Sequence, residues 1–236
     1  MVASPMSTMA RMIETCLETL GSDTFAVVFS DFVETMGIDQ VMIFAIDEPL
    51  ARCLFSRHFG NAALAGELAA AYLDGGYQSD PLLPALRKAT AGTVQLWRLE
   101  DIQSGMDEAY RARFFDGPGL RTKTTAIAAG DTLRLFVSFY STELRGDACD
   151  PDLARLAARM ALMHFERALD TGIPAPLTVL SSREQAVCLG ILAGRKSEAI
   201  AGDIGVAASS VITYRKRAYT KLGISSRAEL FALCSG

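Results

Sequence analysis

The sequence predicts an α-β-α sandwich around a sheet of about five strands, mixed or antiparallel, followed by a smaller all-α domain of four helices. Up to about residue 170, short β-rich runs alternate with segments of helical spacing. After residue 177 every periodic segment has helical spacing. The segment DTGIPAPL, 170–177, holds two prolines and a glycine, so it cannot continue a helix. We therefore expect an α/β domain at 1–170, a linker at 171–176 and a helical domain at 177–236.

The first domain combines predicted helices with two predicted β-hairpins. Two of the helices open at an Asp-Pro pair, where Asp80 and Asp150 are expected to take the N-cap position. The turns of the hairpins are expected at EPL and at Gly130-Asp131. In chain order, the expected elements are a helix at 23–37, strands at 40–47 and 51–58, helices at 61–76 and 80–89, a strand at 93–97, a helix at 106–117, strands at 123–130 and 134–141, and a helix at 150–169.

The last helix of the first domain has an apolar stripe. Leu153, Leu156, Met160 and Met163 recur along one side of 150–169, with alanines between them. Such a stripe either covers the sheet or forms an interface with a second copy of the chain.

The second domain is predicted to be four short helices. The first has Ser181 and Glu184 at the spacing of a capping box. Two short helices, a tight turn with glycine and then a basic helix form the order of a helix-turn-helix. The expected helices span 181–194, 197–205, 208–223 and 226–234.

Charge divides the chain in the same place as the secondary structure. From Leu177 onward there are eight Lys and Arg against four Asp and Glu, so this segment carries +4 within a chain of net charge −4. The part before it therefore carries −8. An acidic body joined to a small basic tail is typical of a regulator whose tail contacts a polyanion, although a solvated basic face has the same composition.

The helix at 208–223 carries most of the functional signal, because four cations fall between Arg215 and Lys221. With Val211, Ala218 and Leu222 turned inward, its cationic side faces outward. A helix of this width fits the major groove of DNA, where hydroxyls and cations contact phosphates and base edges. The candidate DNA-binding residues are Ser210, Ile212, Thr213, Tyr214, Lys216, Arg217 and Lys221.

These residues have expected roles and structural alternatives. Thr213 and Lys216 are best placed for base edges, with Ile212 beside them for a thymine methyl, and the others lie nearer the phosphates. Alternatively, the cations form a solvated helix face, Ile212 packs against the neighbouring helix, and Tyr214 belongs to the core.

The stretch LSSREQAVCLGILAGRKSEAIAGDIGVAASSVITYRKRAYTKLGISSRAEL resembles the DNA-binding domain of the LuxR/FixJ-type transcriptional regulators. Among the matching pairs are Arg183-Glu184 and Tyr214-Arg215, together with the Lys-Leu-Gly that follows at 221–223. There are two departures. Ala207 stands where the family has a capping Ser or Thr, which costs about 0.5–2 kcal/mol of cap stability. Ile212 stands where a polar or basic residue is common.

The stretch AAAYLDGGYQSDPLLPALRKATAGTVQLW resembles the autoinducer-binding domain of quorum-sensing LuxR-type proteins. The resemblance implies a ligand site in which a carboxylate accepts the ligand's amide N–H while Tyr and Trp donate to its carbonyls. The candidate ligand-binding residues are Tyr72, Tyr77, Asp80 and Trp97. Asp80 has an alternative as a helix N-cap, and Tyr77 and Trp97 as core residues. Lys123 replaces a glycine that is common in the family.

A phosphate-accepting receiver domain does not fit the first domain. The candidate strands end in AID, SRH, QLW and AAG, and no lysine follows the fifth strand. The resemblance instead implies a ligand-responsive regulator that binds palindromic DNA as a dimer. Its effector is an acyl-homoserine lactone or a related small amphipathic molecule. The alternative is a ligand-independent regulator whose first domain serves dimerisation or protein interaction.

Composition narrows the remaining classes. The five cysteines are widely spaced, which indicates reduced thiols and a cytoplasmic protein. His58 and His164 have no ligand-spaced partner, and no catalytic motif is present, so we expect neither a metal, nor another cofactor, nor an enzyme. The expected partners are double-stranded DNA, a second copy of the chain, a small-molecule ligand and RNA polymerase, with no membrane.

Overall fold

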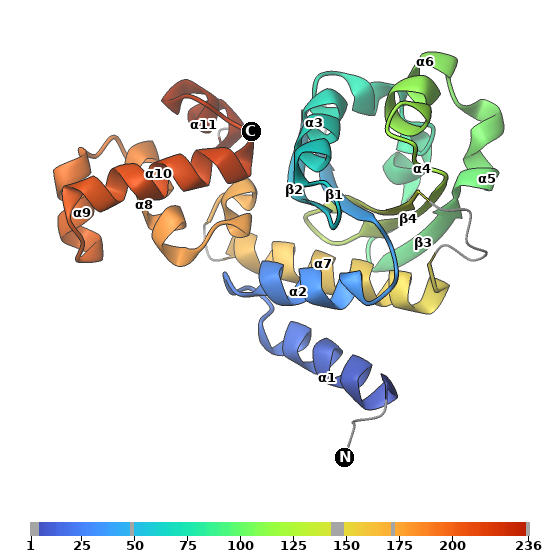
Figure 1. The fold of residues 1–236 in the computed structure, drawn as a ribbon, viewed down its shortest axis with the longest axis horizontal. Coiled ribbons are helices and arrows are strands. Elements are labelled where there is room, and N and C mark those ends of the chain that lie inside the picture. The colour runs from blue at the N-terminus through green and yellow to red at the C-terminus, as the bar shows by residue number, and fades with distance from the viewer. Residues whose placement is uncertain (1–4, 48–49, 143–148, 171–172, 235–236) are drawn as a thin grey trace.

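The computed structural model describes residues 5–47, 50–142, 149–170 and 173–234. It contains an α/β domain and a smaller helical domain that lie side by side (Figure 1). Glu48 and Pro49 of the first predicted hairpin turn lie outside the described residues, as do Thr171 and Gly172 of the predicted linker.

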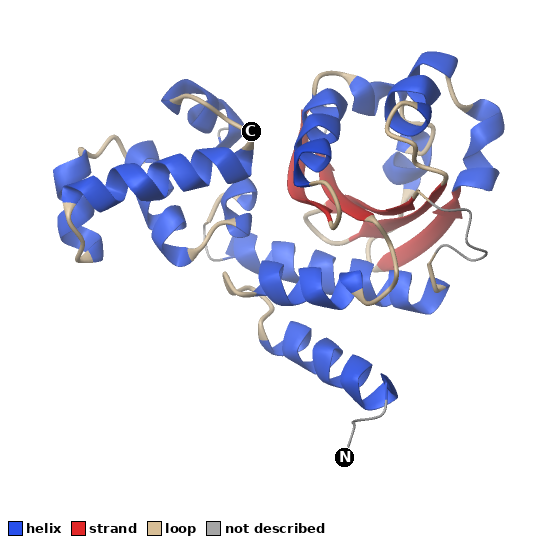
Figure 2. Cartoon of the chain, in the orientation of Figure 1, coloured by secondary structure: helices blue, strands red, loops and turns tan. Residues whose placement is uncertain are grey.

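The α/β domain is built on one five-stranded sheet with the strand order β2-β1-β5-β4-β3, in which every neighbouring pair is antiparallel. Figure 2 shows this sheet in red with the helices of the domain around it in blue. The prediction of about five strands, mixed or antiparallel, is confirmed, and of these two arrangements the sheet has the antiparallel one. The helical connection from β2 to β3 joins the two edges of the sheet, so it places no two parallel strands side by side. The strands are β1 (Gln40–Asp47), β2 (Leu50–His58), β3 (Thr93–Arg98), β4 (Thr122–Ala129) and β5 (Arg134–Ser141).

Helices cover both faces of the sheet, as predicted (Figure 1). Side chains alternate along β1, so Val41 and Ile43 enter one apolar core while Met42 and Phe44 enter the other. On the first face lie α1 (Pro5–Glu18), α2 (Phe25–Glu34) and α7 (Pro151–Asp170). On the second face lie α3 (Ala62–Leu73), α4 (Leu83–Lys88), α5 (Leu99–Ile102) and α6 (Glu108–Arg111).

The helix α7 covers the sheet with most of its apolar stripe. Met160 is buried, as are the small residues Ala157 and Ala161 that allow close approach, whereas Met163 is exposed. Asp150 caps the helix as predicted, because its Oδ1 accepts the N–H groups of Asp152 and Leu153.

Two elements on the second face differ from prediction. The helix expected at 80–89 begins only at Leu83, so Asp80 is not its N-cap. The Asp80 side chain turns into the domain instead, where it accepts the N–H of Leu82 and side-chain hydrogen bonds. The helix expected at 106–117 is α6 followed by a π-helical turn at Ala112–Asp116.

The helical domain has the four predicted helices around its own core. Val211 and Ala218 of the third helix are buried against Ile200 and Val187. The packing is close at Gly190, where an added Cβ would lie 2.7 Å from Ile200 Cγ1. The helices are α8 (Ser182–Leu192), α9 (Ser197–Ile204), α10 (Ala208–Leu222) and α11 (Arg227–Cys234).

The described part of the junction between the domains is packed. A 3-10 turn, η4 (Ala175–Val179), contacts β2 and α7 on one side and α8, α10 and α11 on the other. Leu177 and Leu180 are fully buried. Asp23, in the loop between α1 and α2, accepts the N–H of Ser182 at 2.8 Å and so satisfies one of the free N–H groups at the start of α8.

None of the described helices combines the length and the apolar character that a membrane span requires.

His164 of α7 holds the loop that reaches the second domain. Its Nδ1 accepts the N–H of Gly21 at 3.0 Å, and its ring stacks on Phe25 with 4.0 Å between centroids. Burial lowers the pKa of His164 from 6.5 to about 4, because the imidazolium loses its hydration there.

Acidification is therefore expected to destabilise the α/β domain through His164. Above pH 6.5 the imidazole is neutral in both states, and between pH 6.5 and 4 only the unfolded chain binds the proton. The free energy of unfolding should fall by about 3 kcal/mol across this window from this group alone. Urea unfolding at a series of pH values measures this fall in the free energy of unfolding. The fall should be absent in His164→Asn and still present in the control His58→Asn. An unchanged slope in His164→Asn would contradict the assignment.

Candidate DNA-binding helix and ligand cavity

The helix α10 presents the predicted cationic side to solvent. Thr213, Lys216 and Arg217 are exposed, and Arg215 joins them. The buried side of the same helix carries Val211 and Ala218, so the face assignment made from the sequence agrees with the packing. This arrangement can place cations and hydroxyls in a groove of a nucleic-acid duplex.

Ile212 is 54% exposed, which excludes burial against the neighbouring helix. It lines a surface groove of about 510 Å³ that is formed by α10, the turn after it and the first residue of α11. Ser210 and Tyr214 are half-buried, and Tyr214 packs against the core of the helical domain. The groove is lined by Ile212, Arg215, Lys216, Tyr219, Thr220, Ile224, Ser225 and Arg227.

Lys221 has a partner inside the protein. Its Nζ donates to Glu184 Oε2 at 2.7 Å, and the Glu184 side chain is only 4% exposed. The same oxygen accepts the N–H of Ser181, which confirms the predicted capping box of α8. Burial alone would raise the pKa of Glu184, but the hydrogen bonds from Lys221 and Ser181 outweigh it and lower that pKa. From the sequence we expected Lys221 near the DNA phosphates. In the structure its ammonium binds Glu184 and so connects α10 to α8.

The start of α10 lacks a side-chain N-cap, in agreement with the alanine found in the sequence at position 207. Ala207 occupies the N-cap position with extended backbone, and no side chain caps the helix. The backbone oxygen of Ala207 accepts the N–H of Ser210 at 2.9 Å.

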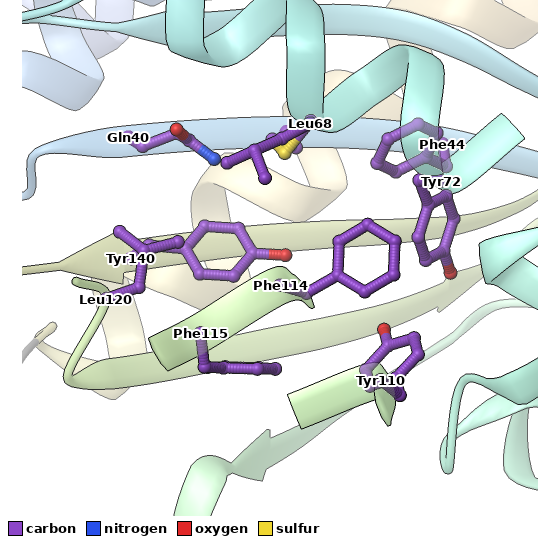
Figure 3. A pocket seen from close by; sticks show the side chains of 10 residues that line it. Gln40, Phe44, Leu68, Tyr72, Tyr110, Phe114, Phe115, Leu120 and Tyr140 are labelled. Carbon is purple, nitrogen blue, oxygen red and sulfur yellow. The ribbon is translucent and has the colours of Figure 1, made fainter. Parts of the chain in front are cut away.

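A buried hydrogen-bond network lies between the sheet and the helices α3–α6. Asp80 Oδ2 accepts the hydroxyls of Tyr72 and Tyr110, both at 2.9 Å, and Oδ1 accepts the N–H of Leu82 at 2.9 Å. Figure 3 shows the two tyrosine hydroxyls pointing toward the same place. Burial first, and then the Asp80 charge, raise the pKa of Tyr72 and of Tyr110 well above the ordinary value, so both remain donors.

Lys123 supplies the counter-charge of this network. Its Nζ lies 3.8 Å from Asp80 Oδ2, and each side chain is 3% exposed. Its ammonium also lies 5.8 Å from the ring centroid of Phe115 and 5.7 Å from that of Tyr140. Burial works against the ammonium, but the Asp80 carboxylate outweighs it, so the pKa of Lys123 is raised. Asp80 and Lys123 therefore face each other as a buried ion pair.

The space beside this network is narrow. Its volume is about 10 Å³, which holds about one water molecule. Tyr72 lines it, while Tyr77 is buried in the same apolar core and Trp97 is packed at its edge. Gln40, Tyr72, Tyr110 and Tyr140 are its polar side chains, among Met42, Phe44, Leu68, Phe114, Phe115 and Leu120 (Figure 3).

The structure thus brings Tyr72 and Asp80 together, as the sequence predicted, and adds partners that sequence reasoning missed. Tyr110 and Gln40 gave no local signal, since each is an ordinary residue of its element. Lys123 did give one. Lys123 lies in the strand TKTTAIAA, and a lysine that is buried in a sheet requires a buried carboxylate near it.

Replacing Lys221 tests its structural role. Lys221→Met leaves Glu184 buried without its cation, and because Lys221 is about half exposed we expect a loss of about 1 kcal/mol in the free energy of unfolding. Lys216→Met, on the exposed side, should change stability by less than about 0.5 kcal/mol. Urea unfolding compares the two. If Lys221→Met left stability intact but weakened DNA binding, the ammonium would serve DNA as the sequence suggested.

Replacing Lys123 tests the buried ion pair. Lys123→Met leaves the Asp80 carboxylate without a counter-charge, so the free energy of unfolding should fall by about 3 kcal/mol. The double variant Lys123→Met/Asp80→Asn should recover much of this loss, because the asparagine amide is neutral. Lys88→Met, exposed on α4, is the control. Additive losses in the double variant would show that the two side chains are not coupled.

Residues 178–234, which contain the four helices and the exposed basic face, match the family model of the "Bacterial regulatory proteins, luxR family". An HTH-type transcriptional regulator in the exeN 3' region of Aeromonas salmonicida is 29% identical over 182 residues, covering 65% of this chain and 92% of that protein.

Among solved structures, SdiA in complex with octanoyl-rac-glycerol aligns at 17% identity and a TM-score of 0.48, covering 99% of this chain and 97% of that one. The VqsR LBD domain from Pseudomonas aeruginosa aligns at 17% identity and a TM-score of 0.49, covering 68% and 96%. The family match and the observed helix-turn-helix together identify residues 178–234 as a DNA-binding domain of the luxR type.

Proposed function

We propose that the protein binds palindromic double-stranded DNA as a homodimer and that a small amphipathic molecule in its α/β domain controls this binding. An acyl-homoserine lactone is the leading candidate for the effector. The observation that carries the DNA-binding part is the exposed basic side of α10, opposite the buried Val211 and Ala218.

The DNA-contacting residues divide by position on α10. Thr213 and Lys216 reach base edges, with Ile212 against a thymine methyl, while Ser210, Tyr214 and Arg217 lie toward phosphates. Lys221 stays with Glu184 and contributes through the position of α10. A helix-turn-helix of this kind reads two half-sites related by the symmetry of a dimer.

The ligand part rests on the polar cluster buried between the sheet and α3–α6. Tyr72, Tyr77, Asp80 and Trp97 gather around one apolar core, where a hydrogen-bonding head and an apolar tail can both be accommodated. In this proposal a ligand completes that core and fixes the dimer, which sets the separation of the half-sites.

A ligand-independent regulator is the second candidate, and two observations favour it. The space beside Asp80 is only about 10 Å³, and the Asp80 carboxylate already has two tyrosines, a backbone N–H and Lys123 around it. In this form the α/β domain folds without an effector and serves dimerisation. Sedimentation and mobility shift of the full chain, with and without N-octanoyl-homoserine lactone, separate the two candidates. Equal binding by a monomer would overturn both.

Two substitutions on α10 test the face assignment. A duplex selected from random sequences serves as the specific site, and each of its base pairs is then varied. Lys216→Ala should relax discrimination at one position by about 1–3 kcal/mol, because a base-edge contact is lost. Arg217→Ala should weaken the selected and scrambled duplexes alike and reduce the salt dependence by about one charge.

Lys88→Ala, on α4 of the other domain, is the control for both variants. Fluorescence anisotropy at several salt concentrations gives the affinities. If Lys216→Ala and Arg217→Ala had equal effects on base discrimination and on salt dependence, the assignment of Lys216 to base edges and Arg217 to phosphates would be refuted.

A further inference from the structure

Gln40, the first residue of β1, is fully buried and lines the narrow space beside the Asp80 network. Within the described residues, neither Oε1 nor Nε2 of its amide has a hydrogen-bond partner. A buried polar group without a partner costs about 1–3 kcal/mol, so native proteins rarely keep one unless it has a use. Figure 3 shows the Gln40 side chain on the same side of the sheet as Tyr140.

The strand register places Gln40 in a row with Lys123. Gln40 pairs with Tyr140 across β1 and β5, and Tyr140 pairs with Lys123 across β5 and β4. Residues opposite each other in antiparallel strands point to the same face. The amide, the phenol and the ammonium therefore lie side by side beneath α3 and α6.

The charges in this row are already balanced. The Lys123 ammonium is paired with the Asp80 carboxylate, and Tyr72 and Tyr110 donate to that carboxylate. A charged molecule beside them would be buried without a counter-ion, which is costly at this depth. Among the described residues, the buried side-chain atoms without a partner are both polar atoms of the Gln40 amide, Trp97 Nε1 and Thr122 Oγ1. Of these residues, only Gln40 lines the narrow space, and its amide offers an NH2 group that donates and an oxygen that accepts.

We propose that Gln40 binds the head of the effector and that the effector is an uncharged amphipathic molecule whose head presents a donor beside an acceptor, as a carboxamide does. The proposal rests on the ligand-responsive form of the proposed function. In this proposal Asp80 accepts hydrogen bonds only from the protein and fixes Tyr72, Tyr110 and Lys123 in position. The head of the effector is bound by Gln40 on β1 instead. The body of the effector lies against Met42, Leu68 and Phe114.

Binding requires the space to open. About 10 Å³ cannot hold an eight-carbon chain, so Leu68 of α3 and Phe114 of the π-helical turn must move away from the sheet. The hydrogen bonds gained by Gln40 offset part of the cost of this movement.

Matched eight-carbon probes test the head group. Thermal unfolding of the full chain is measured with octanamide, octanoate, octylamine and octan-1-ol. Octanamide should raise the melting temperature most, whereas octanoate and octylamine should leave it unchanged because their heads are charged. A larger shift with octanoate or octylamine, or no shift with any probe, would overturn the proposal.

Substitution then assigns the recognition to Gln40. Gln40→Leu and Gln40→Met should weaken octanamide binding about tenfold or more, through loss of the hydrogen bonds to its head. Octan-1-ol binding should change little, since the apolar part of the space is kept. Gln95→Leu, exposed on β3, should bind octanamide as the unchanged chain does. The role of Gln40 would be overturned if both Gln40 variants still bound octanamide. It would also be overturned if they lost octanamide and octan-1-ol binding together.

The same preparations are tested for binding to the selected DNA duplex. DNA binding that persists while octanamide has no effect overturns the effector class and leaves the DNA-binding function standing. If the unchanged chain did not bind the selected duplex, the proposed function itself would be contradicted.

Discussion

The carboxylate of Asp80 joins four elements on the second face of the α/β domain. Tyr72 comes from α3, Tyr110 from α6, Lys123 from β4, and the N–H of Leu82 from the segment that leads into α4. Four elements that are separate along the chain therefore meet at one buried charge. Because a buried carboxylate is costly without its donors and counter-ion, each of these elements is fixed in position by the others. The shape of the space beside Gln40 follows from this arrangement.

The helical domain also contains a buried carboxylate that connects separate elements. Glu184 is buried at the start of α8, where it accepts the N–H of Ser181 and the ammonium of Lys221 from α10. The carboxylate thus fixes the DNA-binding helix against the first helix of the domain. Because Lys221 is committed to this pair, the outward charge of α10 comes from Arg215, Lys216 and Arg217.

The two domains are connected by packing as well as by the chain. The turn η4 touches β2 and α7 on one side and the helices of the second domain on the other, and Asp23 caps the start of α8 from the α1–α2 loop. That loop is tied to α7 by the hydrogen bond between Gly21 and His164. A change on α7, which covers one face of the sheet, therefore has a direct physical route to α8 and, through Glu184, to α10.

The sequence by itself determined the features that depend on near neighbours. Helical and strand periodicity, the capping box of Ser181 and Glu184, and the alternation of buried and exposed residues on α10 were all readable, because each arises within a few residues. The antiparallel order of the sheet, the pair between Asp80 and Lys123, and the pair between Glu184 and Lys221 were decided only by the tertiary structure. Their partners are tens of residues apart, and a buried charge takes whichever counter-charge the packing brings within reach.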